Sequence, residues 1–194
     1  MEQTQTVTSE QMRSRIFRFS ERRPHVNHAA GADIPAAALA ALNPPLYLML
    51  AHVGADAPAG SRPAVVGASG LSVAMLEISP GQKAPLHVHR RSHEAFVCLK
   101  GQVKFRWNEQ GAEETILDPF DMIDFPVGVY RDFQCVGDEP ALLLGIITDE
   151  REEEPGDISI APEERARFAE RFGGEILEQL TAATGLLFTD PPGE

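Results

Sequence analysis

The chain has 194 residues and a mass of 21.1 kDa, which fits one domain with extensions better than two full domains. Lysine and arginine total 17 against 29 aspartates and glutamates, so the net charge is −12. This acidic balance argues against binding to nucleic acid or to an anionic membrane, because both need a basic surface. No secretory signal stands at the start, and the longest apolar run, residues 141–147, is far too short to cross a bilayer. We therefore expect a cytoplasmic protein whose two cysteines are reduced.

Three zones follow one another along the chain. Residues 1–44 are polar and then alanine-rich, and a short helix is expected over 34–42, before Asn43 and two prolines. Residues 45–148 combine short apolar segments with frequent glycine and proline turns, which is typical of an antiparallel β-barrel. Residues 149–194 begin with an acidic segment and continue with helices expected at 162–172 and 175–183. The strands expected in the middle zone are residues 47–53, 71–78, 95–100, 103–107, 115–117, 122–125, 129–136 and 141–148.

One stretch of the middle zone carries metal-binding chemistry. His87 and His89 stand two residues apart, so on a strand both imidazoles project from the same face. Glu94 follows after a short Arg-Arg-Ser-His insertion that offers a turn or a bulge, and it adds a carboxylate. Two histidines and one carboxylate with open positions are the ligand set of many non-haem iron oxygenases. An isolated His-x-His pair is usually surface decoration, but here a strand-rich region surrounds the pair.

His93 competes with Glu94 for the third position in this set. An unbroken strand would put His93 on the face of His87 and His89, and Glu94 on the opposite face. A three-histidine site is then possible. The alternative is that the insertion breaks the strand, so that Glu94 joins the two histidines and His93 lies in a solvent-facing turn.

These residues resemble the first motif of the cupin superfamily. That motif is a glycine, five residues, His-x-His, three or four residues, a glutamate, six residues and a glycine. Its fixed positions are all matched, by Gly81, His87, His89, Glu94 and Gly101. The six residues that separate Glu94 from Gly101 favour Glu94 over His93 as the ligand.

The second cupin motif is matched only in part. It reads glycine, five residues, Pro-x-Gly, two residues, histidine, three residues and asparagine. Pro126 and Gly128 fall in register, whereas Phe120 stands at the opening glycine, Arg131 at the histidine and Cys135 at the asparagine. In cupins that histidine is a further metal ligand, so this sequence departs from the family at the metal site.

The resemblance covers about residues 45–148 and implies a mostly β fold. The expected form is a small antiparallel β-barrel of the cupin type, a double-stranded β-helix or jelly roll, with its site in the interior. The resemblance also implies a homodimer and a metal-dependent enzyme, first of all a non-haem dioxygenase-like oxidoreductase acting on a small anionic or aromatic substrate. Isomerases and decarboxylases are the alternatives within the same fold.

Arg131 leaves two main interpretations open, while a third, in which a local bulge turns Arg131 outward, is disfavoured because Pro126 and Gly128 hold the register. Arginine stays protonated and has no lone pair to donate, so it cannot replace the histidine ligand. In the first interpretation a divalent metal, iron by preference and otherwise Mn, Ni or Zn, stays on His87, His89 and Glu94, and Arg131 clamps an anionic group of the substrate. In the second, the guanidinium displaces the metal and pairs with Glu94, and the barrel binds or senses a small ligand without catalysis.

Alternation along the strands supplies the remaining candidates. Phe96 and Cys98 share the face of Glu94, and Phe133 and Cys135 share the face of Arg131. These four fill the barrel core or form the apolar wall of a substrate pocket. The catalytic candidates are Arg131 and Tyr130, although Tyr130 projects to the opposite face unless its strand is bulged.

Overall fold

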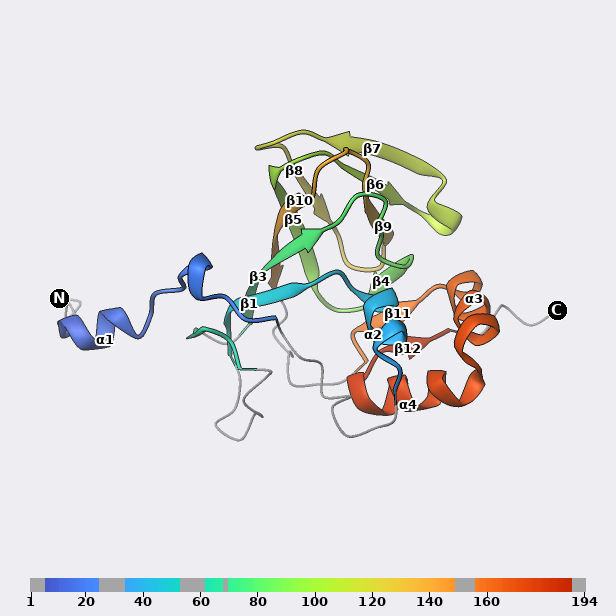
Figure 1. Cartoon of the computed structure of the whole chain (residues 1–194), viewed down its shortest axis with the longest axis horizontal. Coiled ribbons are helices and arrows are strands. Elements are labelled where there is room, and N and C mark those ends of the chain that lie inside the picture. The colour runs from blue at the N-terminus through green and yellow to red at the C-terminus, as the bar shows by residue number, and fades with distance from the viewer. Residues whose placement is uncertain (1–5, 25–33, 53–61, 68–69, 149–155, 190–194) are drawn as a thin grey trace.

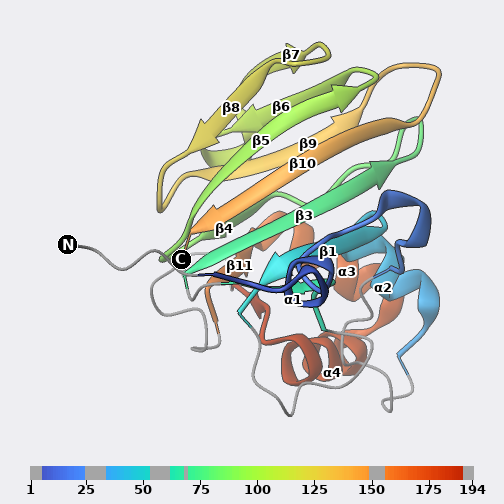
Figure 2. The same cartoon turned by 90° about the vertical axis from the view of Figure 1, so that its left-hand side faces the viewer.

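The computed structural model describes residues 6–24, 34–52, 62–67, 70–148 and 156–189. Two six-stranded β-sheets face each other and form the body of the molecule (Figures 1 and 2). The fold is mostly β and of the jelly-roll type, as expected, but it consists of two separate sheets and not of one closed cylinder. The first sheet has the order β2 (Val65–Val66), β1 (Leu46–Ala51), β3 (Leu71–Ile78), β10 (Ala141–Thr148), β5 (His93–Lys100) and β8 (Met122–Phe125). The second has the order β12 (Leu187–Phe188), β11 (Ile158–Ile160), β4 (His87–His89), β9 (Tyr130–Cys135), β6 (Val103–Trp107) and β7 (Glu113–Leu117).

The space between the two sheets is filled by apolar side chains. Its centre is a group of four phenylalanines whose ring centroids lie 5.2–6.5 Å apart. Each ring comes from a different strand, and all four are at most 3% exposed. Burying such large rings supplies much of the favourable free energy of folding. The four rings are Phe96 on β5, Phe105 on β6, Phe125 on β8 and Phe133 on β9.

Helices gather at one end of the two sheets. Helix α2 (Ala36–Leu42) precedes the first sheet in the chain, and helices α3 (Pro162–Phe172) and α4 (Gly174–Thr184) follow the last strand of that sheet (Figures 1 and 2). Helix α3 begins with Pro162 at its first position and has two glutamates in its first turn, whose negative charges interact favourably with the positive end of the helix dipole. Together the three helices bury a second apolar cluster, made by Ala38, Leu42, Phe168, Leu177 and Leu180.

The remaining short elements lie near the N-terminus and in one hairpin. Helix α1 (Ser9–Arg13) has no buried residue and extends away from the sheets (Figure 1). The 3-10 turn η1 (Phe19–Glu21) follows it, and the 3-10 turn η2 (Glu109–Gly111) connects β6 to β7.

Most of the predicted strands are present with small changes in their bounds. The predictions for β3, β6, β8, β10 and helix α3 agree with the observed bounds to the residue. Val53, the last residue of the strand predicted at 47–53, lies outside the described residues, as do residues 149–155 of the acidic segment. The predicted strands did not include β2, β4, β11 or β12, although a strand over His87 and His89 was considered as a condition for their shared face. Strand β11 pairs with β4, so the chain beyond residue 148 takes part in the second sheet.

Candidate metal centre

Four buried side chains from three strands meet between the sheets. His87 and His89 lie on β4, and Arg131 lies opposite His87 on the neighbouring strand β9. Glu94 comes from β5 in the other sheet. Donor atoms of His87, His89 and Glu94 all lie within 4.8 Å of one another, so these three residues form a group that could hold a metal ion. The structure therefore brings together all three predicted ligands and Arg131.

A turn places Glu94, and not His93, beside the two histidines. Strand β4 ends at His89, residues 90–92 form a turn, and β5 begins at His93. Because the turn interrupts the alternation, Glu94 faces the interior and is 7% exposed, whereas His93 is exposed. The insertion after His89 thus interrupts the strand alternation, so that Glu94 and not His93 lies on the same side as the two histidines.

Both imidazoles turn the same nitrogen toward the centre. The Nδ1 atom of His87 lies 2.8 Å from the carbonyl oxygen of Pro85, and a carbonyl can only accept a hydrogen bond. Nδ1 therefore carries the proton, and Nε2 of the neutral ring keeps a lone pair. Burial, followed by the positive charge of Arg131, holds the pKa of His87 well below its ordinary value of 6.5. His87 is consequently neutral near pH 7, which is the state that binds metals.

His89 is oriented by a residue that the sequence reasoning missed. Its Nδ1 atom lies 2.8 Å from Oδ2 of Asp157 and 2.6 Å from Oγ of Ser92. Its Nε2 atom faces Glu94, with Oε2 at 3.5 Å. Two donors bound to one ion at roughly 2.1 Å stand about 3 to 3.5 Å apart, so this spacing suits a shared metal.

Arg131 and Glu94 form a buried ion pair. Arg131 is 0% exposed, and its Nε and Nη2 atoms donate to Oε2 of Glu94 at 3.1 and 3.0 Å. Its Nη1 donates to the carbonyl of Val129 at 3.1 Å, and the guanidinium carbon lies 5.6 Å from the ring centroid of Phe125. Both contacts to Glu94 fall on one carboxylate oxygen, and a carboxylate has about four acceptor sites. The donor set therefore fits a divalent transition metal even with the ion pair in place.

The predicted apolar wall is buried between the sheets. Phe96 and Phe133 lie one inward-facing position beyond Glu94 and Arg131, and their ring centroids are 5.4 Å apart. Cys98 and Cys135 are buried free thiols, but each contacts a turn carbonyl: Gly101 at 3.5 Å and Glu139 at 3.3 Å. Burial raises the pKa of the Cys98 thiol, so it stays protonated at neutral pH.

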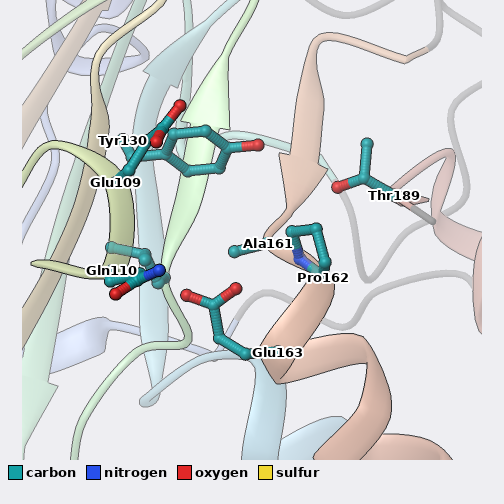
Figure 3. A pocket seen from close by; sticks show the side chains of 8 residues that line it. Glu109, Gln110, Tyr130, Ala161, Pro162, Glu163 and Thr189 are labelled. Atoms are coloured by element: carbon teal, nitrogen blue, oxygen red, sulfur yellow. The ribbon is translucent and has the colours of Figure 1, made fainter. Parts of the chain in front are cut away.

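Tyr130 lies apart from the candidate centre. It lines a pocket of about 350 Å³ together with Leu86, Glu109, Gln110 and residues at the start of α3 (Figure 3). Arg131 next to it is fully buried on the inner face of β9, as alternation in an unbulged strand requires. The structure does not bring Tyr130 together with His87, His89, Glu94 and Arg131.

The carboxyl group of Asp157 is held by four donors. Besides His89 and the hydroxyl of Ser92, the backbone N–H groups of Arg91 and Ser92 donate to it at 2.8 and 3.2 Å. Burial alone would raise the pKa of Asp157, but the hydrogen bonds from His89 and Ser92 outweigh burial and hold the pKa far below its ordinary value. Asp157 is therefore ionised and accepts from every one of these donors. The only hint in the sequence is the short alternating segment Ile158-Ser159-Ile160 that follows it.

Comparison with known proteins agrees with this fold. Residues 74–147 match the family model described as "Cupin domain". A putative germin-like protein of Arabidopsis thaliana, subfamily 1 member 2, is 28% identical over 96 residues, which cover 47% of this chain and 41% of that protein. The chain thus spans less than half the length of this curated relative.

Several solved structures have a similar fold. TT1209 from Thermus thermophilus has a TM-score of 0.40 and 28% identity, covering 44% of this chain and 78% of that one. DMSP lyase DddQ from Ruegeria pomeroyi DSS-3 has a TM-score of 0.49 and 17% identity, covering 69% and 59%. A putative sugar phosphate isomerase from Acidithiobacillus ferrooxidans has a TM-score of 0.38 and 21% identity, covering 42% and 52%. Among the described residues, no helix is long and apolar enough to span a membrane.

Proposed function

Because residues 74–147 of this chain form a cupin domain, we propose that the protein is a metal-dependent enzyme acting on a small anionic or aromatic substrate. The ion is held by His87, His89 and Glu94. The observation that carries the proposal is the orientation of the two imidazoles, whose Nδ1 atoms are engaged outside the centre while their Nε2 atoms are free to bind a metal.

Iron is the metal that we propose first, with Mn, Ni or Zn as alternatives. Two histidines and one carboxylate with open positions suit ferrous iron in oxygenases, so the reaction class we favour is a non-haem, dioxygenase-like oxidation. A bound divalent ion would supply a Lewis acid, and iron would in addition supply redox chemistry. Isomerisation or decarboxylation are the alternatives that need the Lewis acid alone.

The protein's own residues have distinct roles in this proposal. The contacts of Arg131 to Glu94 and Val129 engage three of the five N–H donors of an arginine. We assign the other two donors to an anionic group of the substrate, which a planar guanidinium binds well. The rings of Phe96 and Phe133 support the centre from the apolar side and keep water away from it. The homodimer and the cytoplasmic location remain predictions.

One observation favours a second function, that of a metal-free protein which binds a small ligand without catalysis. The ion pair of Arg131 with Glu94 is the contact that such a protein needs, because a buried guanidinium is costly without a partner. In that case the Arg131→His variant would acquire a metal site that the wild type lacks.

Metal content per subunit tests the proposed function. Untagged protein is purified without chelator and measured by elemental mass spectrometry as the wild type and as the variants His87→Ala and Glu94→Gln. His93→Ala is the matched control, because His93 is a neighbouring histidine that points to solvent. We expect close to one equivalent of a transition metal in the wild type and the control, and a large loss in the two ligand variants. Oxygen consumption with small aromatic and keto-acid compounds then tests the reaction class.

Two results would contradict the proposal. One is a wild type that stays metal-free after incubation with Fe(II), Mn(II), Ni(II) and Zn(II). The other is full metal content and turnover in both ligand variants. The first result would also favour the metal-free alternative, and the Arg131→His variant would then decide it.

A further inference from the structure

We propose that Asp157 is a positioning residue of the metal centre, supplied by the chain beyond the cupin domain. It fixes His89 in the tautomer that leaves Nε2 free, and it holds the turn that brings Glu94 to the same site. This inference rests on the proposed function for its metal, but the contacts that support it are hydrogen bonds among the chain's own residues.

The tautomer of His89 follows from the donors around Asp157. Both oxygens of Asp157 accept hydrogen bonds from other donors, Oδ1 from two backbone N–H groups and Oδ2 from a hydroxyl, so Nδ1 of His89 is the donor in the 2.8 Å contact with Oδ2. The hydroxyl of Ser92 donates to the same Oδ2 at 2.6 Å, so its oxygen is free to accept from Nδ1 as well. A neutral ring with its proton on Nδ1 carries its lone pair on Nε2, which faces Glu94.

The second role of Asp157 concerns the turn between β4 and β5. Its Oδ1 accepts from the backbone N–H groups of Arg91 and Ser92, and its carbonyl accepts from the N–H of Arg90 at 2.8 Å. These three bonds engage all three residues of the turn that interrupts the alternation. The same carboxylate thus orients one ligand directly and supports the turn on which the place of Glu94 depends.

The segment that carries Asp157 is itself fixed to β4, the strand of His87 and His89. Strand β11 pairs antiparallel with β4, with Ile158 opposite His89 and Ile160 opposite His87. The side chain of Ser159 accepts from Nε of Arg90 at 2.6 Å and is fully buried. The family match ends at residue 147, so this contact to the centre comes from a part of the chain that the match does not include.

The Asp157→Asn variant isolates the positioning role. An asparagine keeps an oxygen for the two backbone donors of the turn, but its NH2 group donates toward Nδ1 of His89 and favours a proton on Nε2. Ser159→Ala is the matched control, because it loosens β11 on β4 without touching His89. Two measurements are made on each protein: the tautomer of His89 by ¹⁵N NMR without metal, and the Kd for Zn(II) by competition with a chromophoric chelator.

We expect the Nδ1–H tautomer in the wild type and in Ser159→Ala, and the Nε2–H tautomer in Asp157→Asn. The Kd for Zn(II) should rise about 10- to 100-fold in Asp157→Asn, which is the usual effect of losing such a partner, and by less than about twofold in the control. The tautomer of the wild type already tests the assignment of the proton without any substitution.

Three results would overturn the inference: an Nε2–H tautomer in the wild type, an unchanged tautomer and Kd in Asp157→Asn, or an equal loss of affinity in Ser159→Ala. A wild type that binds no metal would contradict the proposed function and not the inference about Asp157. The tautomers of His89 in the wild type and in Asp157→Asn would still decide whether Asp157 positions this ring.

Discussion

Phe120 has a left-handed backbone conformation in the turn between β7 and β8, with a φ of 79°. It follows Pro119, and the N–H of Asp121 donates to the carbonyl of Asp118 at 3.0 Å, which closes a β-turn of four residues. A proline followed by a positive φ is the pattern of a type II turn, whose third position usually holds glycine. The cupin motif has a glycine at this place, which is the residue that a positive φ favours.

Replacing Phe120 with glycine should stabilise the protein. The phenyl ring is 83% exposed, so its removal loses little burial, while the strain of a side chain at positive φ is relieved. We expect the Phe120→Gly variant to gain about 1 kcal/mol in free energy of unfolding by urea titration. Gly128→Ala is the opposite control, because Gly128 has a φ of 82° with open space around it and should lose a similar amount. A Phe120→Gly variant less stable than the wild type would contradict this explanation.

Arg22 connects the N-terminal segment to the first sheet. Arg22 follows η1 and donates to Glu77 of β3 at 2.9 Å, while its guanidinium carbon lies 3.8 Å from the ring centroid of Phe19. The hydroxyl of Tyr47 on β1 donates to the same carboxylate. Helix α1 has no buried residue, so these contacts hold the segment in place.

The attachment of η1 should weaken in acid. The hydrogen bond from Tyr47, and then that from Arg22, lowers the pKa of Glu77 below its ordinary 4.5, although burial opposes them. A carboxyl group whose pKa is lower in the folded than in the unfolded protein stabilises the fold fully at pH values above its unfolded-state pKa. This stabilisation is lost as the pH falls through the folded-state pKa. Glu77 is one-third exposed, so the contribution is at most about 1 kcal/mol.

Hydrogen exchange of the amides of Glu21 and Arg22 measures this effect. We expect exchange about two- to fivefold faster in Glu77→Gln than in the wild type at pH 7, after correction for intrinsic rates. Glu114→Gln, which removes another exposed ion pair on β7, should leave these amides unchanged. As the pH falls below 4.5 and through the lowered pKa of Glu77, the difference between the wild type and the variant should shrink, and a difference that does not shrink down to the acid limit of the fold would show that the carboxylate is not responsible.

The elements that the sequence predicts well are those with enough residues to carry a pattern. β3, β6, β8 and β10 have alternation or clear turns at both ends, and their bounds were predicted to the residue. β2, β11 and β12 have two or three residues and depend on a neighbouring strand, so they are too short for alternation to mark them clearly. His87, His89 and Glu94 were found because they lie within eight residues of one another. Asp157 could not be found in this way, because 65 residues separate it from Ser92.

Chain segments that precede and follow residues 45–148 pack against each other. Ala38 and Leu42 of α2 contact Phe168, Leu177 and Leu180 of α3 and α4, in a cluster separate from the core between the sheets. Strand β11 covers one side of β4, which would otherwise have an open edge. The sheets therefore depend on chain segments from both sides of residues 45–148.

A fragment of residues 45–148 should consequently be unstable. It lacks β11 and the helical cluster, so it exposes apolar surface and leaves the edge of β4 unpaired, which promotes aggregation. We expect this fragment to aggregate or to unfold without cooperativity in urea, followed by circular dichroism and size-exclusion chromatography. A chain of residues 34–189 keeps both clusters and should unfold with nearly the midpoint of the full protein. A monomeric 45–148 fragment with the full-length midpoint would refute this dependence.

The position of Asp157 has a consequence for the order of events during synthesis of the chain. A ribosome delivers both histidines, Glu94 and Arg131 well before it reaches residue 157. Until then β4 lacks its neighbour β11, and Nδ1 of His89 lacks its carboxylate acceptor. A nascent chain that ends before residue 157 therefore has His87, His89 and Glu94 without the group that orients His89. If these three residues bind the proposed metal, we expect full affinity only after residue 157 has been synthesised.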